Sequence, residues 1–142
     1  MKNIYSNIYS FNKKTLKKTI NSLNLSNLVS LPTETVYGLA GNAYSNKAIK
    51  KIFKLKKRPK KNPLIIHYLN IKNVGRDAIL NKNFLRLYKH FCPGPITFIL
   101  KKNKKSKIDK LATANLSTVA IRFPKHKIIR AILKVLDFPL AM

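Results

Sequence analysis

The sequence predicts an α/β domain in which an open, mixed sheet is covered by helices. Short apolar runs typical of strands alternate with segments whose apolar residues recur at helical spacing, and prolines end several of these segments. The 142 residues suffice for one domain, and 45% of them are hydrophobic, which is enough for a packed core. We therefore expect a single domain over residues 12–142, behind an irregular lead-in at residues 1–11.

The N-terminal third is expected to contain one helix and one strand. An N-cap at Ser10 or Asn12 precedes three apolar residues at helical spacing, Leu16, Ile20 and Leu23. Residues 27–31 form a short apolar run that Pro32 stops, which is typical of a strand. No strand is assigned to residues 37–41, where two glycines leave room either for close packing or for a ligand.

A basic helix and a buried strand are expected next. The helix begins at an N-cap, Ser45, and ends at Arg58 before Pro59. Lysines fill the positions around its apolar face, which consists of Ala48, Ile49, Ile52 and Phe53. Residues 64–68 form a short apolar run behind a proline, which indicates a buried strand.

The second half continues the alternation of helices and strands. The expected segments are a turn with a short helix at 70–80, a helix at 84–91, a strand at 96–100, a basic loop at 101–110, a strand at 118–123, a helix at 128–136 and the start of a strand at 139–142. The helix at 84–91 ends at Cys92-Pro93-Gly94-Pro95, where two prolines flank a glycine. Because the sequence stops where a strand begins, we expect it to be a fragment.

The charge of the chain is extreme, with 30 Lys+Arg against 4 Asp+Glu and a net charge of +26. Such a field attracts nucleotides and RNA. AT-rich codons explain part of the lysine content, but not the scarcity of acids. Four acids cannot build a two-metal carboxylate site, and neither a P-loop nor a GxGxxG motif is present. Chemistry in this chain is therefore expected to depend on positioning and on cations.

The remaining composition indicates a reducing compartment. The single Cys92 cannot form an internal disulfide. No run of about 18 apolar residues and no apolar leader occurs in the sequence. We expect a cytoplasmic protein that does not bind membranes.

Several side chains are candidates for ligand binding, each with a structural alternative. Thr33 follows a strand end, where open α/β sheets bind ligands, although threonine is also common in turns. Lys56 and Arg58 flank one residue at a helix end, which suits phosphate binding, although in a chain this rich in lysine a solvated basic helix end is the more common explanation. His67 ends an apolar run and is either a hydrogen-bonded structural residue or a binding residue.

Arg122 provides the strongest argument for a ligand. It interrupts an apolar strand and alternates with Ala120 and Thr118 on one face. A buried arginine needs an anionic partner, and the chain offers only four acids. Arg122 therefore either faces water or binds an anionic ligand.

Four ordered motifs resemble those of the YrdC/Sua5 family: LPTETVYGLAGNA, KLKKRPKKNPLIIH, FCPGPITFIL and STVAIRFPKH. The resemblance covers residues 12–142 and implies a YrdC-like twisted open sheet. It also implies a nucleotidyltransferase that makes threonylcarbamoyl-adenylate from L-threonine, bicarbonate and ATP with Mg²⁺. This product is the precursor of N6-threonylcarbamoyladenosine in tRNA, so a downstream threonylcarbamoyl transferase complex is the implied partner.

The resemblance also assigns roles to individual residues. Threonine binding is implied for Thr33, His67 and Arg122. ATP binding is implied for Lys56, Arg58, Asn62 and Thr118. No protein side chain is implied as a metal ligand, because Mg²⁺ comes with the triphosphate.

The sequence departs from the family at three places. Lys57 stands where a glycine is usual, and Cys92 where a tryptophan is usual. The P-S-A-N motif, whose serine and asparagine complete the ATP site of the family, does not follow within this sequence, which ends at Met142.

Two other functions remain open. One is a module that binds double-stranded RNA or tRNA through its basic surface without catalysis. The other is the related carbamoyl-adenylate chemistry of one module of the hydrogenase maturation factor HypF, in which acylphosphatase and zinc-finger modules lie upstream.

Overall fold

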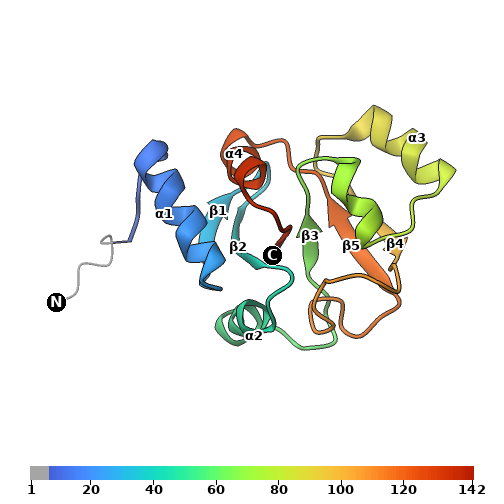
Figure 1. The fold of residues 1–142 in the computed structure, drawn as a ribbon, viewed down its shortest axis with the longest axis horizontal. Helices are drawn as coiled ribbons and strands as arrows, with labels where there is room; N and C mark the ends of the chain where they lie inside the picture. The colour runs from blue at the N-terminus through green and yellow to red at the C-terminus, as the bar shows by residue number, and fades with distance from the viewer. Residues whose placement is uncertain (1–6) are drawn as a thin grey trace.

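A six-stranded mixed sheet runs through the centre of the molecule in the order β1-β2-β6-β3-β5-β4 (Figure 1). This computed structural model describes residues 7–142. The strands are β1 (Val29–Pro32), β2 (Tyr37–Asn42), β3 (Ile65–His67), β4 (Thr97–Lys101), β5 (Thr118–Arg122) and β6 (Leu140–Ala141). β3 and β5 are parallel, and the other neighbours are antiparallel. The predicted α/β class with an open mixed sheet is confirmed.

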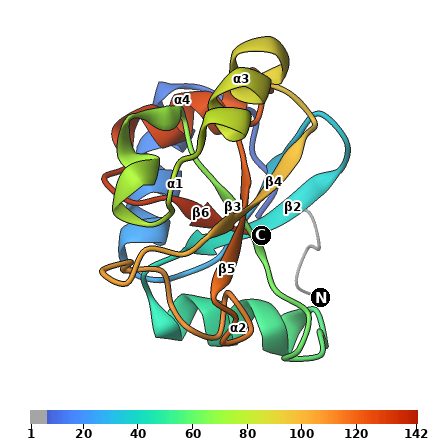
Figure 2. The ribbon, with the colours of Figure 1, turned by 90° about the vertical axis from the view of Figure 1, so that its right-hand side faces the viewer.

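Helices pack against both faces of this sheet (Figures 1 and 2). They are α1 (Lys13–Asn24), α2 (Asn46–Leu55), the 3₁₀ helix η1 (Ile71–Arg76), α3 (Lys82–Phe91) and α4 (Lys127–Val135). α1 and α4 contribute to one apolar cluster with β1, β2 and β6. α2, η1 and α3 contribute to a second cluster with β3, β4 and β5. No helix within residues 7–142 is long and apolar enough to cross a lipid bilayer.

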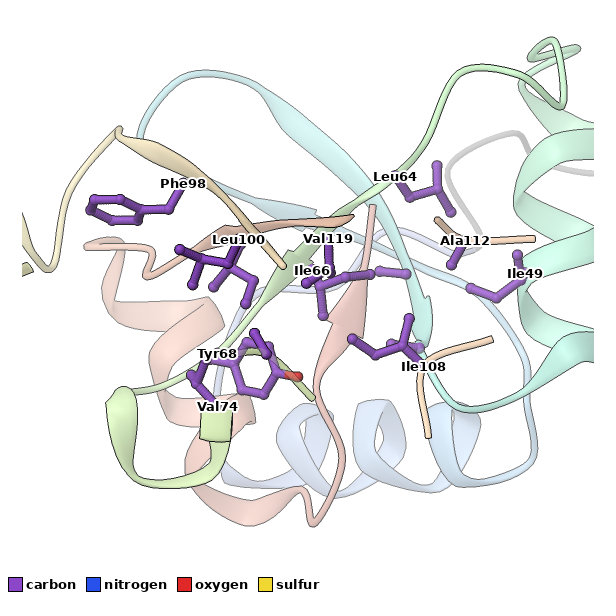
Figure 3. Close-up of a cluster of buried hydrophobic side chains, with 14 of the residues drawn as sticks. Ile49, Leu64, Ile66, Tyr68, Val74, Phe98, Leu100, Ile108, Ala112 and Val119 are labelled. Atoms are coloured by element: carbon purple, nitrogen blue, oxygen red, sulfur yellow. The ribbon is translucent and has the colours of Figure 1, made fainter. Parts of the chain in front are cut away.

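The larger core lies between the helices α2, η1 and α3 and the centre of the sheet (Figure 3). Ile66 of β3 and Val119 of β5 lie at its centre, and both are almost completely buried. Side chains alternate between the two faces along a strand, so their neighbours His67 and Thr118 point to the opposite face. The core therefore determines which side chains of β3 and β5 remain available for a ligand.

Hydrogen-bonding side chains begin the helices as expected. Asn12 accepts from the backbone N–H of Thr15, whose hydroxyl accepts in turn from the Asn12 N–H, which completes a capping box. Ser45 caps α2 by accepting from the Ala48 N–H. Residues 7–11 form neither helix nor strand. The remainder of the predicted lead-in, residues 1–6, lies outside the described residues.

A buried carboxylate fixes several loops to one another. Asp77 is fully buried and accepts hydrogen bonds from the hydroxyls of Tyr44, Tyr68 and Ser106 and from the Lys107 N–H, at 2.7–3.0 Å. Burial and the Asp77 carboxylate raise the pKa values of both tyrosines. This arrangement connects the start of α2, the end of β3 and the loop between β4 and β5.

One local prediction was wrong. Residues 37–42 form β2, although this stretch of small residues shows no strand pattern. Its neighbouring strands decide this outcome, and local spacing carries no information about them. The predicted helix at 84–91 is confirmed as α3. Its apolar side chains are unequally buried, since Phe84 is 3% exposed while Leu87 and Phe91 are 38% and 55% exposed.

Candidate functional site

One half of one sheet face carries no helix among the described residues. α1 and α4 cover β1, β2 and β6 on this face, and the cluster they form includes no side chain of β3, β4 or β5. Ile99 of β4 points to the uncovered half and is 65% exposed. In Figure 2 this half lies on the right-hand side, where β4 and the turn between β1 and β2 are seen. We call the uncovered surface of β3, β5 and β4 the open face.

Strand register gathers polar side chains into one row across the open face. His67 of β3 pairs with Arg122 of β5, and Arg122 pairs with Thr97 of β4. Paired residues point to the same face of a sheet. Arg122 is half-buried, and its Nε donates to Thr97 Oγ1 at 3.0 Å. Neither terminal guanidinium nitrogen of Arg122 donates to another residue of the described chain, so both remain available to an anion.

His67 is the buried, neutral member of this row. It is 3% exposed, and its Nδ1 lies 3.2 Å from the Ile65 carbonyl oxygen, which can only accept. Burial, and secondly the Arg122 charge, lower the pKa of His67 to about 4. The Glu34 carboxylate and hydrogen bonds to backbone groups of Ile65 and Leu140 oppose this shift without reversing it. Near neutral pH the site therefore presents one fixed cation, Arg122, and an uncharged imidazole.

The turn between β1 and β2 approaches the same end of the open face. Glu34 Oε2 accepts from the Lys125 N–H at 3.3 Å, just beyond β5. Its Oε1 is buried and has no hydrogen-bond partner within residues 7–142. The hydroxyl of Thr33 bonds within its own turn, to Val36 O and to Thr35. Glu34 also lies close enough to His67 for its charge to act on it. The turn that carries Thr33 and Glu34 therefore lies at the same end of the face as His67 and Arg122.

The loop between α2 and β3 carries the predicted phosphate-binding cations. Lys56 is the C-cap of α2, and its exposed side chain makes no hydrogen bond to a described residue. Arg58 folds back along the loop: its Nε donates to Asn62 O at 2.9 Å and its Nη2 to Pro63 O at 2.7 Å. Lys57 between them has φ 48°, a left-handed conformation. The motif that this segment resembles has a glycine at this position, and glycine adopts the left-handed conformation without steric cost.

The nucleotide candidates lie at the other end of the open face. Thr118 begins β5, and Ala120 of the same strand pairs with Ile65. Continuing this parallel register by two residues places Thr118 opposite Pro63, whose carbonyl holds Arg58. Thr118 and Arg122 are four residues apart on one strand, or about 13 Å at 3.3 Å per residue. The structure thus forms two groups at opposite ends of β3 and β5, and Ala120 lies between them.

Two surface cavities, of about 880 and 180 Å³, lie away from the candidate residues, beside β1 and α1 and between η1 and α4. None of the seven predicted residues lines either of them. Within residues 7–142, no three His, Cys, Asp or Glu side chains cluster as metal ligands would.

Sequence reasoning missed one member of the row, Thr97, and one residue near it, Glu34. Thr97 was treated only as part of a strand, and Glu34 was noted in its motif but assigned no role. Alternation along residues 96–100 indicates that Thr97 and Ile99 share a face. The pairing of Thr97 with Arg122 depends on the order of the strands in the sheet, which the spacing of residues in the sequence does not specify.

Fold and site together describe an α/β protein with an open sheet face on which the terminal nitrogens of Arg122 remain available to an anion. A family model described as "Sua5_yciO_yrdC: Telomere recombination" matches residues 21–142, and the chain belongs to this family. The resemblance expected from the four motifs is therefore confirmed.

Curated relatives carry one recurring name. The chain is 40% identical over 118 residues to "Threonylcarbamoyl-AMP synthase" of Pyrococcus abyssi, which covers 80% of this chain and 33% of the relative. It is 40% identical over 115 residues to the protein of the same name from Bacillus subtilis, with the same coverage. The chain thus spans about a third of the length of these relatives.

Solved structures agree with the fold. "Crystal structure of P. abyssi Sua5 complexed with L-threonine" matches with a TM-score of 0.87 at 34% identity, over 94% of this chain and 39% of that one. A full-length HypF in the phosphate- and nucleotide-bound form matches with a TM-score of 0.78 at 25% identity, over 89% of this chain and 20% of that one.

Proposed function

We propose that this chain provides the substrate-binding face of an L-threonylcarbamoyladenylate synthase, a nucleotidyltransferase. The single observation that carries the proposal is the row on the open face, where the unfilled donors of Arg122 lie beside neutral His67. The name of the curated relatives and the threonine complex of the Pyrococcus abyssi structure support the same substrate. The HypF alternative has less support, because its match is at lower identity.

Arg122 is the proposed receptor for the threonine carboxylate. A guanidinium presents two parallel N–H donors to a carboxylate, and the Nε bond to Thr97 fixes the orientation of this fork. His67 remains uncharged near neutral pH, so it adds no repulsion toward the substrate ammonium. Thr33, in the turn at the same end, is proposed to contact the substrate through its hydroxyl.

Lys56, Arg58, Asn62 and Thr118 are the proposed nucleotide-binding residues. Lys56 is exposed and has no partner within the described chain, so its charge is available to a triphosphate. Arg58 donates hydrogen bonds to Asn62 O and Pro63 O, which hold the shape of the loop. We propose that it binds the nucleotide phosphates from this position. The spacing of about 13 Å between Thr118 and Arg122 leaves room for the reacting groups over the small side chain of Ala120.

The proposed chemistry requires alignment and charge neutralisation. The threonine amine and bicarbonate form a carbamate with loss of water. A carbamate oxygen then attacks the α-phosphorus of ATP, and pyrophosphate leaves with its bonding electron pair. Mg²⁺ enters with the triphosphate as part of the substrate. The cations of this face stabilise negative charge on the phosphates and hold the two substrates in line.

Pyrophosphate release tests the proposal. The purified chain is expected to release pyrophosphate from ATP only when threonine and bicarbonate are both present. Arg122→Lys keeps the charge but loses the paired donors, so we expect the threonine KM to rise about tenfold to a hundredfold, equivalent to about 1.5–3 kcal/mol. Lys56→Ala is expected to raise the KM for ATP instead.

Lys89→Ala and Arg86→Ala provide matched controls, because both side chains are exposed on α3, away from the open face. Both variants are expected to retain the parent kinetics. Threonine saturation that is unchanged in Arg122→Lys would contradict the carboxylate assignment. Pyrophosphate release from ATP in the absence of threonine would contradict the proposal that threonine is the substrate.

A further inference from the structure

Three of the four acids in this chain are hydrogen-bonded on both sides or face water. Asp77 is fully buried and accepts from three hydroxyls and one backbone N–H. Asp109 accepts one hydrogen bond from the first residue of α2 and one within its own loop. Asp137 is exposed to solvent. Glu34 differs from these three, because part of its carboxylate is buried and has no donor.

The carboxylate of Glu34 has one filled and one unfilled oxygen. Oε2 accepts from the Lys125 N–H at 3.3 Å, which is long for such a bond. Oε1 is buried and has no hydrogen-bond partner within residues 7–142. A buried carboxylate oxygen without a donor is unfavourable, and this chain has 30 Lys+Arg that could have supplied one. The unfilled oxygen therefore indicates a donor that comes from a ligand.

Glu34 lies at the same end of the open face as the row of His67 and Arg122. Lys125, whose N–H contacts Glu34, follows Arg122 by three residues beyond the end of β5. His67 is within reach of both charges, since Arg122 lowers its pKa and Glu34 raises it. This end of the face thus carries one cation and one anion that act on the same buried imidazole.

The carboxylate of Glu34 can present its unfilled oxygen to a ligand. The side chain is only partly buried, and the next two residues of its turn, Thr35 and Val36, are exposed. The last torsion of a glutamate side chain is broad and roughly two-fold, so rotation of the carboxylate exchanges its two oxygens. Because the bond from the Lys125 N–H is long, a charged donor competes with it effectively.

An ammonium group is the donor that suits this position. In an α-amino acid the ammonium is attached to the carbon next to the carboxylate, so a receptor for both needs an anion near a cation. Arg122 supplies the cation, with two terminal nitrogens that donate to no other described residue. A metal ion is a poorer fit, because no three His, Cys, Asp or Glu side chains cluster anywhere in the described chain.

We propose that Glu34 binds the ammonium group of the amino-acid substrate while Arg122 binds its carboxylate. This inference rests on the proposed function and deepens it, because it assigns a receptor to the nitrogen that becomes the carbamate. A hydrogen bond between two charged groups is about twice as strong as one between neutral groups. A site that provides such a partner rejects analogues that lack the group, so Glu34 selects amino acids over the corresponding plain acids.

A comparison of L-threonine with (R)-3-hydroxybutanoate tests this inference. The analogue keeps the carboxylate, the hydroxyl and the methyl group and lacks the amino group. Isothermal titration calorimetry measures the Kd of both ligands for the parent chain and for Glu34→Gln. Glutamine keeps the shape of the side chain and an oxygen that accepts from the Lys125 N–H. Asp137→Asn is the matched control, because it removes the same charge from an exposed acid beside the cavity between η1 and α4.

The parent is expected to bind threonine at least about tenfold more tightly than the analogue. Glu34→Gln is expected to weaken threonine binding by about tenfold to a hundredfold. The Kd of the analogue is expected to stay the same or to fall, because Glu34 offers its carboxylate only repulsion. Arg122→Lys is expected to weaken both ligands, since both carry the carboxylate, and Asp137→Asn is expected to retain the parent values.

A second measurement needs no variant and decides the matter if Glu34→Gln does not fold. Glu34 is the one glutamate in the sequence, so isotope labelling of the glutamate carboxyl carbon gives a single nuclear magnetic resonance signal that reports on it. Saturating threonine is expected to shift this signal farther than saturating (R)-3-hydroxybutanoate does, because only threonine brings a cation to the carboxylate.

Two results would overturn the inference and leave the proposed function standing. One is threonine binding by Glu34→Gln that is unchanged, or that is weakened no more than binding of the analogue, which would show that the carboxylate only holds its turn. The other is a Glu34 signal that threonine does not move although the parent binds threonine. A parent chain that binds neither ligand would overturn the proposed function as well.

Discussion

At the scale of single residues, His67 and Arg122 show how two paired strands can place two basic side chains together while only one of them is charged. The row across β3 and β5 sets them side by side, and burial keeps the imidazole neutral near neutral pH. A second cation there would repel the first. Neutral His67 therefore lets Arg122 remain the fixed charge of the row.

The depressed pKa of His67 predicts a loss of stability in acid. An unfolded histidine takes up a proton as the pH falls through about 6.5, whereas folded His67 remains neutral down to about 4. The unfolded state thus binds more protons in this window, and the free energy of unfolding falls as the pH is lowered, by roughly 3 kcal/mol at most. Urea titrations between these pH values measure the slope.

His67→Gln is expected to remove that part of the slope, and His90→Gln, whose side chain is exposed on α3, is expected to retain it. The same pH dependence in both variants would rule out His67 as its source.

Residue-level reasoning proposed members of the candidate site but not their arrangement. The scarcity of acids identified Arg122, because an arginine in an apolar strand with no acid to pair with indicates a ligand. The row of Thr97, Arg122 and His67 depends on the neighbours of β5, and a linear pattern does not specify neighbours. Arg58 differs in another way: its bonds to Asn62 O and Pro63 O give it a place in the loop that its motif does not reveal.

At the scale of elements, helix caps were reliable, while strands made of small residues were not. Asn12 and Ser45 begin their helices as predicted, because these side chains supply the acceptor that a first turn lacks. β2 was missed because its two glycines and its alanine have low intrinsic preference for strands. β2 is held as a strand by its backbone pairing with β1 and β6, since its own side chains favour a strand only weakly.

Close packing between β2 and α2 predicts that Gly41 does not tolerate a side chain. A Cβ at Gly41 would lie 2.8 Å from Leu28 Cδ2 and 3.2 Å from Ala48 Cβ. Gly41→Ala is expected to lower the free energy of unfolding by about 1–3 kcal/mol, as overpacked cores do. Gly75→Ala is the matched control, because a Cβ there meets nothing within 4 Å, and we expect a change within about 0.5 kcal/mol. Urea unfolding midpoints of equal size for the two variants would contradict this packing.

At the scale of the whole molecule, net charge sets the conditions under which the fold is stable. A charge of +26 on 142 residues repels itself, and mobile anions screen this repulsion. We expect the urea midpoint to rise as sodium chloride increases from about 0.02 to about 0.5 M, with an unchanged m-value. A midpoint that falls with salt would mean that attractive ion pairs outweigh the repulsion.

The position of β6 has a consequence for how the chain comes to be folded on the ribosome. β6 lies between β2 and β3, and within residues 7–142 it is the strand through which the hairpin of β1 and β2 joins β3, β5 and β4. During synthesis the two parts can each form early, yet the continuous sheet waits until residues 140–142 have left the exit tunnel. Until then the facing borders of β2 and β3 expose unpaired backbone groups, and a nascent chain in that state is vulnerable to aggregation.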